Sequence, residues 1–472
     1  MERVHAFRDD ALSDSDAVAL VERLRTGDVS ASEVVDAAIA RAEAVNPALN
    51  GLAFEAFDRA RAEAMRPRTG YFAGVPTFIK DNVEVGGMPT MQGTDAWDPK
   101  PAPADGDWAA TFLATGVIPL GKTQLSEFGF SAAAEHPRIG PVRNPWNLDH
   151  TSGASSSGSG VFVAAGVVPI AHANDGGGSI RIPASCNGLV GLKPSRGRLP
   201  LDKQMRQMPL RVVHNGVVTR SVRDTAAFYR EAERLWRPRK LAPIGDVTAA
   251  GRQRLTVGVL TRSLYRECDP EVRELTLKTA ALLEELGHRV EHLDNPPVPM
   301  TFADDFILYY AFLSYALVHG GRRMFGPSFD TSKFDNLTIG FERHAARNMH
   351  RLPLALTRLR LMRRRTARLF RTHDVVLTPT LADPPTPIGH FDPTADYQQI
   401  IARLMDWVAF TPLQNATGDP AISLPLAESA AGLPIGMMFS AAPGQERRLL
   451  ELAYELEAAR PWRRIQDPAS AA

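Results

Sequence analysis

The sequence predicts an α/β protein in which a central sheet is covered by helices on both faces. Short apolar runs that suit buried strands alternate with segments whose apolar residues recur every three or four positions, as in amphipathic helices. Such alternation builds sheets with helices packed on both sides. With 472 residues, of which 44% are hydrophobic, the chain can form one large core or two to three ordinary domains. We expect a single domain over residues 1–472.

The N-terminal part, about residues 14–65, is predicted to be a helical scaffold. Its first helix carries one apolar face before Gly27 ends it, formed by Ala17, Leu20, Val21 and Leu24. Ser30 and Glu33 have the spacing of a capping box that begins a second helix, and Asn46-Pro47 is expected to end that helix. A third helix is predicted over about residues 53–65.

A core region is expected over about residues 70–230, which also contains the serine and glycine clusters described below. It begins with an apolar strand over Gly74–Lys80 that ends on a lysine. The further elements predicted in this part are a helix end, a turn at Gly116 and a strand within 113–120, a helix at 162–165, and strands at 167–171 and 189–193.

The rest of the chain is expected to continue the same fold after a surface connection at about 236–254, which is rich in Pro, Lys and Arg. Strands are predicted at 255–260, 289–293, 374–377, 421–426 and 434–439. Helices are predicted at 270–286, across most of 302–371, and at 446–458. Residues 383–395 are rich in proline and suit a loop.

The bulk composition excludes several classes of protein. A formal net charge of +1 gives no general attraction to nucleic acid or to an acidic membrane. The two cysteines, Cys186 and Cys268, are too few for a disulfide framework and form no CxxC pair, which favours a reducing cytoplasm. The charged N-terminus lacks the apolar run of a signal peptide. The longest apolar run, Phe306–Val318, is shorter than the roughly 20 residues that span a bilayer, so we interpret it as a buried or pocket-lining helix.

Two clusters of serine and glycine, both within residues 151–196, are the main chemical feature of the chain. In the second cluster, Ser179 follows three glycines, Gly176, Gly177 and Gly178. Glycines allow positive φ and the close approach of a ligand, and successive free N–H groups form an anion-binding nest. A serine beside such a nest can attack a carbonyl carbon while the nest holds the oxyanion. Because serines also cap glycine-rich turns in ordinary loops, the turn by itself leaves its role open.

These clusters resemble the signature of the amidase signature family, a set of serine hydrolases that cleave amide bonds. The similar stretches are Gly153–Ser159, Ala173–Ala184 and Gly188–Pro194, with a lysine strand at Gly74–Asp81 upstream. The departures are Ala154, Ser157 and Ala173 in place of glycine, and Asn174 in place of threonine. The resemblance extends over nearly the whole chain and implies the amidase-signature fold, a central mixed β-sheet with helices on both faces.

The resemblance also implies a catalytic triad of two serines and a lysine. Ser179 would be the nucleophile that forms an acyl-enzyme, and the oxyanion would be held by the backbone N–H groups of Gly176, Gly177, Gly178 and Ser179. The family places its bridging serine 24 positions before the nucleophile, which selects Ser155 (179 − 155 = 24), and holds it after a cis peptide bond. Ser156 would support the bridging serine by hydrogen bonding.

Lys80 follows a run of mostly apolar residues, which places the stem of its side chain inside the protein. A buried lysine has a lowered pKa and can serve as a base. The resemblance makes Lys80 the base that takes the proton of Ser179 through Ser155. Asp175 and Arg181 flank the nucleophile, and we interpret them as a charged pair that braces the turn.

Two other stretches suggest different ligands. Gly116–Thr123 satisfies the P-loop expression G-x-x-x-x-G-K-S/T, but the intervening Val117–Leu120 is itself strand-like and leaves no open loop for a phosphate. The arginine-rich run Leu354–Arg371 is interpreted as an amphipathic helix and not as a contact for nucleic acid or lipid. Its arginines are expected to be solvated, and its inner face is expected to consist of Leu359, Met362, Ala367 and Phe370. Gln124 matches a substrate-facing position of the family, where asparagine is usual.

The sequence therefore predicts an amidase that hydrolyses a small carboxamide to a carboxylate and ammonia or an amine. We expect no cofactor, no metal site, no nucleic-acid or membrane partner and a cytoplasmic location, and a homodimer is left open. Two alternatives remain. The chain could be the catalytic subunit of an amidotransferase, or a nucleotide-binding protein that uses Gly116–Thr123, and a test of ATP binding separates the latter from the rest.

Overall fold

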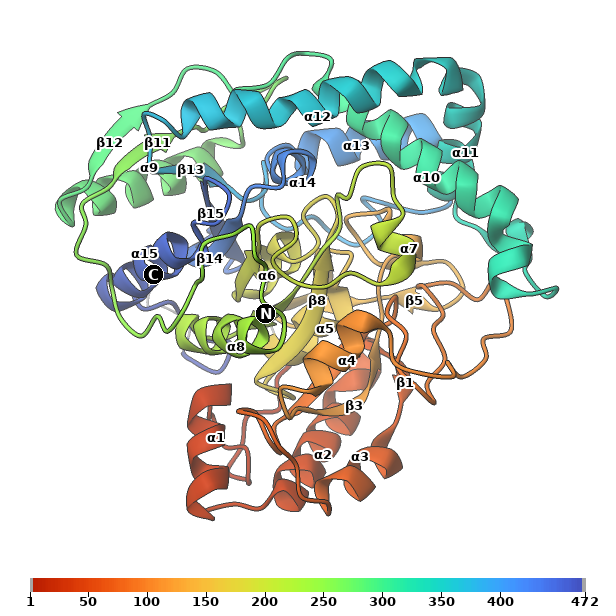
Figure 1. Ribbon diagram of the computed structural model, residues 1–472, viewed down its shortest axis with the longest axis vertical. Coiled ribbons are helices and arrows are strands. Elements are labelled where there is room, and N and C mark those ends of the chain that lie inside the picture. The colour runs from red at the N-terminus through yellow and green to blue at the C-terminus, as the bar shows by residue number, and fades with distance from the viewer. Residues whose placement is uncertain (1–2, 469–472) are drawn as a thin grey trace.

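The computed structural model describes residues 3–468 and is organised around a mixed sheet of eight strands (Figure 1). The order across the sheet is β12-β11-β13-β15-β14-β9-β10-β8, where β11 is parallel to β12 and β13 and all other neighbours are antiparallel. The predicted class, α/β with a central mixed sheet, is confirmed. The strands are β8 (Ile170–Asp175), β9 (Val190–Lys193), β10 (His214–Thr219), β11 (Thr256–Val259), β12 (Arg289–His292), β13 (Val375–Pro379), β14 (Ala421–Glu428) and β15 (Pro434–Ala441).

A smaller sheet of three strands carries Lys80. It consists of β1 (Leu52–Glu55), β3 (Ile118–Thr123) and β2 (Pro76–Lys80) in that order, with β2 parallel and β1 antiparallel to β3. Two short hairpins complete the strands, formed by β4 (Glu135–His136) with β5 (Gly140–Pro141) and by β6 (Arg143–Asn144) with β7 (Asn147–Thr151).

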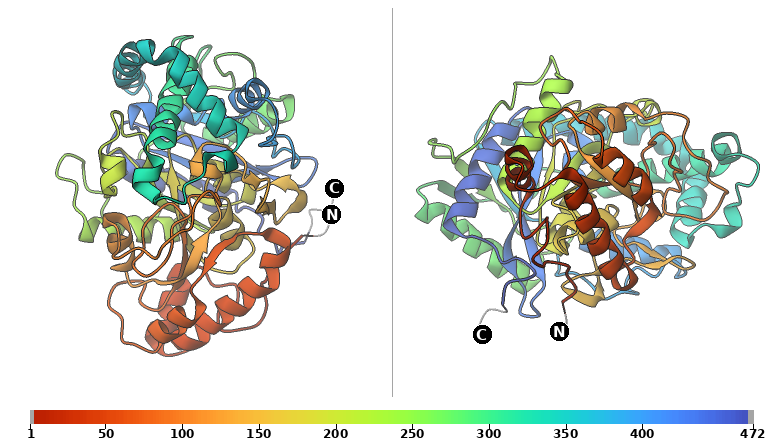
Figure 2. Two further views of the ribbon diagram at one scale, coloured as in Figure 1. Left: turned by 90° about the vertical axis from the view of Figure 1, so that its right-hand side faces the viewer. Right: turned by 90° about the horizontal axis from the view of Figure 1, so that it is seen from below.

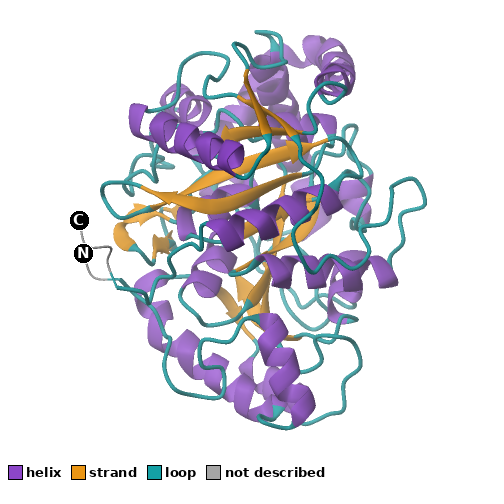
Figure 3. Ribbon diagram, turned by 90° about the vertical axis from the view of Figure 1, so that its left-hand side faces the viewer, coloured by secondary structure: helices purple, strands orange, loops and turns teal. Residues whose placement is uncertain are grey.

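Helices lie on both faces of the large sheet (Figure 3). The first eight are α1 (Ala17–Thr26), α2 (Ala31–Leu49), α3 (Phe57–Ala64), α4 (Asp107–Leu113), α5 (Ser157–Ala164), α6 (Arg181–Asn187), α7 (Lys203–Arg206) and α8 (Val222–Leu235). They are followed by α9 (Pro270–Glu285), α10 (Phe302–Phe325), α11 (Asn336–Asn348), α12 (Leu352–Leu369), α13 (Tyr397–Trp407), α14 (Pro412–Thr417) and α15 (Glu446–Ala459). Short 3₁₀ turns are η1 (Glu127–Gly129), η2 (Thr331–Lys333) and η3 (Met349–Arg351).

The N-terminal helices and the helices of the 300s lie at opposite ends of the molecule. In Figure 1, α1 to α3 and the small sheet occupy the lower end, and α10 to α12 occupy the upper end. The two ends of the described chain lie side by side (Figure 2), where the guanidinium of Arg3 donates to the carbonyl oxygens of Ile465 and Asp467 at 3.3 and 2.8 Å.

Helix α5 joins the two sheets at the point where the serine clusters lie. All of its residues are buried, and it packs against β2 and β3 of the small sheet and against β8 of the large sheet. Because α5 contacts both sheets, it brings the lysine strand next to the strand that leads into the glycine turn.

Three element predictions are corrected by the structure. Asn46-Pro47 does not end the second helix: Pro47 lies inside α2, which runs to Leu49 and ends on Asn50 in the left-handed conformation (φ 54°). The predicted third helix begins later, because Leu52–Glu55 forms β1, which pairs with β3. The strand predicted at 167–171 is displaced to β8, and thus ends directly before the glycine turn.

The arginine-rich run forms a helix as predicted, but its inner face differs from the prediction at one residue. α12 buries Leu359, Met362 and Thr366, whereas Ala367, which was expected to face inward, is exposed. Residues 236–254 form neither helix nor strand and connect α8 with β11, as expected of a surface connection.

Candidate active site

Three segments that are far apart in sequence bring Lys80 and the two serine clusters together. Lys80 ends β2, Ser155 lies just before α5, and Ser179 lies between β8 and α6. The Nζ atom of Lys80 lies 2.6 Å from Oγ of Ser155 and 2.7 Å from Oδ1 of Asn174. Two of the three residues expected to form the triad are therefore in direct contact.

Burial sets the charge of Lys80. Its side chain is fully buried, and burial lowers its pKa to about 7, against a smaller opposite effect from the negative charge of Asp175. The adjacent Asp81 does not face Lys80, because its carboxylate accepts from Lys122 Nζ at 3.1 Å and from the N–H of Met91 at 2.9 Å. The predicted lowering of the Lys80 pKa thus has its expected cause, and Asp175, predicted only as part of the brace, also acts on Lys80 through its charge.

The side chain of Asn174 gives the amine of Lys80 an oriented acceptor. The amide of Asn174 is oriented by a reciprocal pair with Asn82, in which Asn174 Nδ2 donates at 2.8 Å and Asn82 Nδ2 donates at 3.2 Å. This pair turns Oδ1 of Asn174 toward Lys80, which donates to it. A neutral amine that donates there keeps a lone pair for a proton from the Ser155 hydroxyl.

The peptide bond between Ala154 and Ser155 is cis, as the resemblance implies. Ser156, expected to support the bridging serine, acts instead on the nucleophile turn. Its hydroxyl donates to the carbonyl oxygen of Ser179 at 2.6 Å and lies 3.3 Å from that of Asn174. Ser156 therefore joins the two serine clusters through the backbone.

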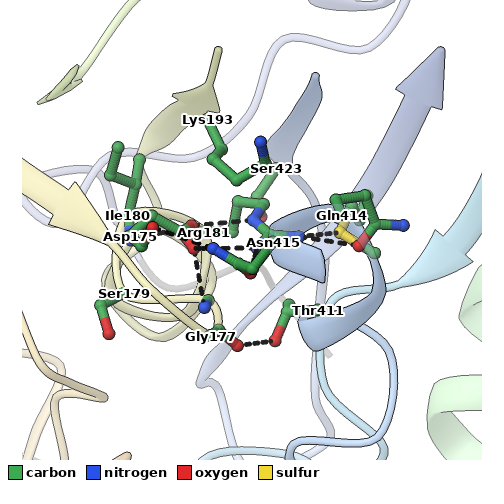
Figure 4. A network of polar contacts seen from close by, with 12 residues as sticks. Asp175, Gly177, Ser179, Ile180, Arg181, Lys193, Thr411, Gln414, Asn415 and Ser423 are labelled. Atoms are coloured by element: carbon green, nitrogen blue, oxygen red, sulfur yellow. Dashed lines mark hydrogen bonds and ion pairs between the residues drawn. The ribbon is translucent and has the colours of Figure 1, made fainter. Parts of the chain in front are cut away.

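Ser179 is 8% exposed, and its side chain points away from the polar network around Asp175 (Figure 4). Its hydroxyl makes no hydrogen bond within residues 3–468, and in particular none to Ser155. The same residue lines a large cavity. The hydroxyl is thus free to meet a carbonyl carbon that enters this cavity.

The glycine turn offers two of its three predicted glycine N–H groups to an oxyanion. The N–H of Gly178 is already used, because it donates to Oδ1 of Asp175 at 2.8 Å, so Gly178 is removed from the predicted oxyanion hole. The N–H groups of Gly176, Gly177 and Ser179 have no acceptor in the described chain. Together they form the nest that remains.

Asp175 and Arg181 form the brace that was predicted. Both side chains are fully buried, and two parallel N–H···O bonds of 2.9 Å join them (Figure 4). Burial alone would raise the pKa of Asp175, but the ion pair with Arg181 outweighs burial and holds that pKa well below its usual range. Because the same carboxylate also holds the N–H groups of Gly178 and Ile180, the charge fixes the turn on both sides of Ser179.

Helix α14 and the residue before it, Thr411, complete this brace. Asn415 donates to the carbonyl and the carboxylate of Asp175 at 2.9 and 2.8 Å, and Gln414 accepts from Arg181 at 3.0 Å. Thr411 donates to the carbonyl of Gly177 at 2.6 Å. These residues could not be predicted as part of the site, because they lie more than two hundred positions after the turn in the sequence. Their only local feature is a short polar run before the strand predicted at 421–426.

The cavity beside Ser179 holds about 910 Å³ of empty space, including its open mouth. Its inner end is formed by Ala154, Gly177 and Ser179, and its walls come mainly from α10 and α13. The predicted pocket-lining helix at 306–318 is confirmed, since Phe306, Ile307 and Tyr310 of α10 line the cavity. Gln124, in contrast, lies outside it, because its backbone is bonded between Gly51 and Gly158.

The P-loop-like stretch has no open loop. Residues Ile118–Thr123 form the fully buried strand β3, and the ammonium group of Lys122 is paired with Asp81 inside the protein. A phosphate cradle needs free N–H groups in a loop and a lysine that can reach the ligand. The buried strand supplies neither.

Glu127, His136 and Asp335 place potential metal-ligand atoms within 4.8 Å of one another. The lone pair on Nδ1 of His136 already accepts the N–H groups of Arg138 and Ile139 at 3.2 and 3.0 Å, so a neutral ring carries its proton on Nε2. Glu127 accepts from Thr94 and from the N–H of Asp335, both at 2.9 Å. Nδ1 of His136 and the carboxylate of Glu127 are thus already hydrogen bonded, whereas Oδ1 of Asp335 has no hydrogen-bond partner within residues 3–468.

The chain is similar to known amidases over almost its full length. The model of the family described as Amidase matches residues 33–450. The protein named "Putative amidase AmiC" of Mycobacterium leprae is 67% identical over 466 residues, covering 99% of each chain. The solved structure of 6-aminohexanoate cyclic dimer hydrolase with substrate is 31% identical, with a TM-score of 0.87 over 96% of this chain and 99% of that one.

A second solved structure, a bacterial aryl acylamidase of the amidase signature family, has a TM-score of 0.84 at 26% identity and covers 95% of this chain and 96% of its own. Among the described residues, no helix has the length and apolar character needed to cross a membrane.

Proposed function

The chain belongs to the amidase family and is an amide-hydrolysing enzyme, and from this premise we propose that it cleaves a small carboxamide through an acyl-enzyme on Ser179. The observation that supports this most is the 2.6 Å contact between Lys80 and Ser155, beside the cavity into which Ser179 opens. A buried amine with a pKa near 7 can accept a proton at neutral pH.

In the proposed first step, Oγ of Ser179 attacks the amide carbonyl carbon. The proton of Ser179 passes to Ser155, and the proton of Ser155 passes to Nζ of Lys80. The attack converts the carbonyl group into a tetrahedral anion. The N–H groups of Gly176, Gly177 and Ser179 hold the anion. The leaving nitrogen takes a proton back from Ser155, the C–N bond breaks, and ammonia or an amine departs.

In the second step, water attacks the ester carbon of the acyl-enzyme. The same relay takes the proton of the water and returns it to Ser179, so that a carboxylic acid leaves and the enzyme is restored. Overall, one amide and one water are consumed, and one carboxylic acid and one molecule of ammonia or amine are formed. The chemistry uses only side chains and backbone groups of this chain, and we propose no cofactor.

Relay through Ser155 requires Ser179 to approach it when substrate binds. The two hydroxyls are not hydrogen bonded to each other in the described chain, although the hydroxyl of Ser156 donates to the carbonyl of Ser179. Catalytic hydrogen bonds often tighten only in the complex with substrate.

The experiment that tests the proposal replaces Ser179 with alanine. Amide hydrolysis should fall at least about a thousandfold, while the thermal unfolding temperature stays near that of the unchanged protein. Ser131→Ala is the matched control, because Ser131 lines the same cavity; it should keep most activity. In addition, hydroxylamine should divert the acyl group of the unchanged enzyme to a hydroxamate. A folded Ser179→Ala protein with substantial activity would refute the assignment.

The alternatives differ in what they require. An amidotransferase subunit would need partner chains and an acceptor, whereas the proposed enzyme should release ammonia as a single purified chain. Nucleotide binding at Gly116–Thr123 is opposed by the burial of β3 and by the Lys122–Asp81 pair. Titration with Mg-ATP should give no heat of binding. A homodimer and a cytoplasmic location stay predictions, which light scattering and cell fractionation would check.

A further inference from the structure

The walls of the cavity beside Ser179 carry no ionisable acid, no basic side chain and no carboxamide. Among the residues that line it, the inner and middle walls are aromatic or aliphatic, as in Phe130, Phe302, Phe306, Ile401 and Leu404. The side-chain polar groups in the lining belong to serine and tyrosine alone. We propose that the substrate is an uncharged amide that carries a bulky apolar group, and that the cavity rejects ionised groups.

This inference rests on the proposed function and adds the substrate class. Apolar surface that enters such a cavity leaves water, and each buried methylene strengthens binding by about fourfold. An ionised carboxylate or ammonium in the same place would lose its water and find no opposite charge. The two effects act in opposite directions on substrates of the same length, and so they can be measured separately.

Aromatic side chains shape the inner wall. Phe130 meets Tyr310 and Phe341 edge to face, with ring centroids 6.1 and 5.8 Å apart, and Phe306 lies 5.1 Å from Tyr310. Phe302 stacks on Phe306 at 5.9 Å. Rings held at fixed angles offer both faces and edges to a flat or cyclic apolar group. The geometry suits an aromatic, alicyclic or linear aliphatic substituent.

The hydroxyl of Tyr310 is the polar group that lies over the glycine nest. A side-chain carbon added to Gly176 would lie 2.7 Å from this hydroxyl oxygen, and one added to Gly177 would lie 3.3 Å from it. The hydroxyl has no hydrogen-bond partner in the described chain, and burial raises the pKa of Tyr310 far above its usual value. It is therefore a neutral donor that can bond the amide group but cannot neutralise a carboxylate.

The same reasoning opposes glutamine as substrate. Glutamine carries an ammonium and a carboxylate close to its amide, and an enzyme that binds it must supply charged or amide partners for both. The lining offers none within residues 3–468. The cavity thus favours the hydrolase over the amidotransferase interpretation.

A matched set of primary amides tests the inference through ammonia release by the full chain. The set is butanamide, hexanamide, 3-phenylpropanamide, glutamine, adipic acid monoamide and the methyl ester of that monoamide. We expect kcat/KM to rise by about fourfold per methylene at most, and the ionised monoamide to be at least a hundredfold poorer than hexanamide. Its methyl ester, which has nearly the same size without the charge, should recover most of the loss.

Met405 gives the corresponding test on the protein. It lines the cavity from α13 without belonging to any of the buried clusters, so Met405→Lys should fold. The added ammonium should improve the ionised monoamide at least tenfold relative to hexanamide, and Met405→Leu should leave the ratio unchanged. Equal rates for the acid and its ester in the unchanged enzyme, or efficient use of glutamine, would overturn the inference.

Failure of the proposed mechanism would give a different result. If Ser179→Ala kept its activity, the mechanism would be wrong, but the ranking of the amides would still decide the inference. If no amide were turned over, calorimetric binding of hexanamide and of the ionised monoamide to the unchanged chain would be compared. Tighter binding of hexanamide supports the inference, and equal or weaker binding refutes it.

Discussion

At the scale of single residues, the proposed mechanism makes the rate depend on the ionisation of Lys80. Its pKa of about 7 predicts an acid limb in kcat/KM near pH 7, because only the neutral amine accepts a proton. An exposed lysine, with a pKa of about 10.4, would be neutral in roughly one molecule in a thousand at pH 7.5. A pH–rate profile from pH 5 to 9 checks the prediction.

Replacement of Lys80 distinguishes a base from a fixed charge. Lys80→Ala should remove most activity together with the acid limb, and Lys80→Arg should not restore it, because a guanidinium keeps its proton at these pH values. Circular dichroism of both variants controls for loss of the fold. An active Lys80→Arg enzyme would mean that the base lies elsewhere.

Asn174 provides a second way to move the same limb. Its side-chain oxygen accepts from Lys80 Nζ at 2.7 Å. Asn174→Asp would place a negative charge there, which favours the ammonium form and should raise the Lys80 pKa by about one unit or more. The acid limb of kcat/KM should therefore move to higher pH, while the rate at its alkaline plateau changes less. Asn82→Asp is the control. Asn82 is hydrogen bonded to Asn174 and not to the amine of Lys80, so this variant should move the acid limb by a smaller amount.

At the scale of elements, the turn between β8 and α6 depends on a buried ion pair. Arg181→Met would leave the carboxylate of Asp175 buried without its partner, and removal of one member of such a pair costs about 3–5 kcal/mol. Denaturant unfolding should show this loss. The double variant Asp175→Asn with Arg181→Met should recover much of the stability but not the activity, because the carboxylate also positions the turn around Ser179. Recovery of full activity would show that the pair serves stability alone.

The elements that the sequence predicts well are those whose signals are local. The capping box at Ser30 and Glu33 forms as its spacing indicates, and the strands and helices of the second half lie within a few residues of their predicted bounds. The errors have tertiary causes. Leu52–Glu55 has no strand signal of its own and becomes β1 by pairing with β3. Helix α2 continues through Pro47 and ends instead on Asn50, whose N–H donates to the carbonyl oxygen of Asn46.

At the scale of the whole molecule, the motif residues could be predicted but the cavity could not. The spacing of Ser155 and Ser179 and the lysine strand carry the resemblance, and the Lys80–Ser155 contact agrees with it. The walls of the cavity come from α10, α11 and α13, and their residues are ordinary apolar helix residues in the sequence. Only the packing of these helices over Ser179 reveals that Phe306 and Leu404 face the same space. The role of Gly178 likewise depends on where Asp175 points.

One buried contact joins η1, whose Gly129 lines the cavity, to the start of α11. This contact predicts how the stability of the protein changes with pH. Glu127 of η1 accepts from the N–H of Asp335 at 2.9 Å and from the hydroxyl of Thr338 at 2.6 Å, at the start of α11. Burial raises the pKa of Glu127 to about 7, and burial together with the charge of Glu127 raises that of Asp335 to about 8. Arg138 and Asp95 also act on this pair, with opposite signs.

Because the folded chain holds these protons to higher pH than the unfolded chain does, stability should fall as the pH rises from about 4.5 through 7 to 8. Glu127→Gln removes one ionisation, so its unfolding temperature minus that of the unchanged protein should increase over this range. The difference is the informative quantity, since the lowered pKa of Lys80 makes its own contribution above about pH 7 in both proteins. Exposed Glu284→Gln is the control. A difference that is the same at pH 5 and pH 8.5 would show that Glu127 is ionised throughout and that the contact between η1 and α11 does not respond to pH.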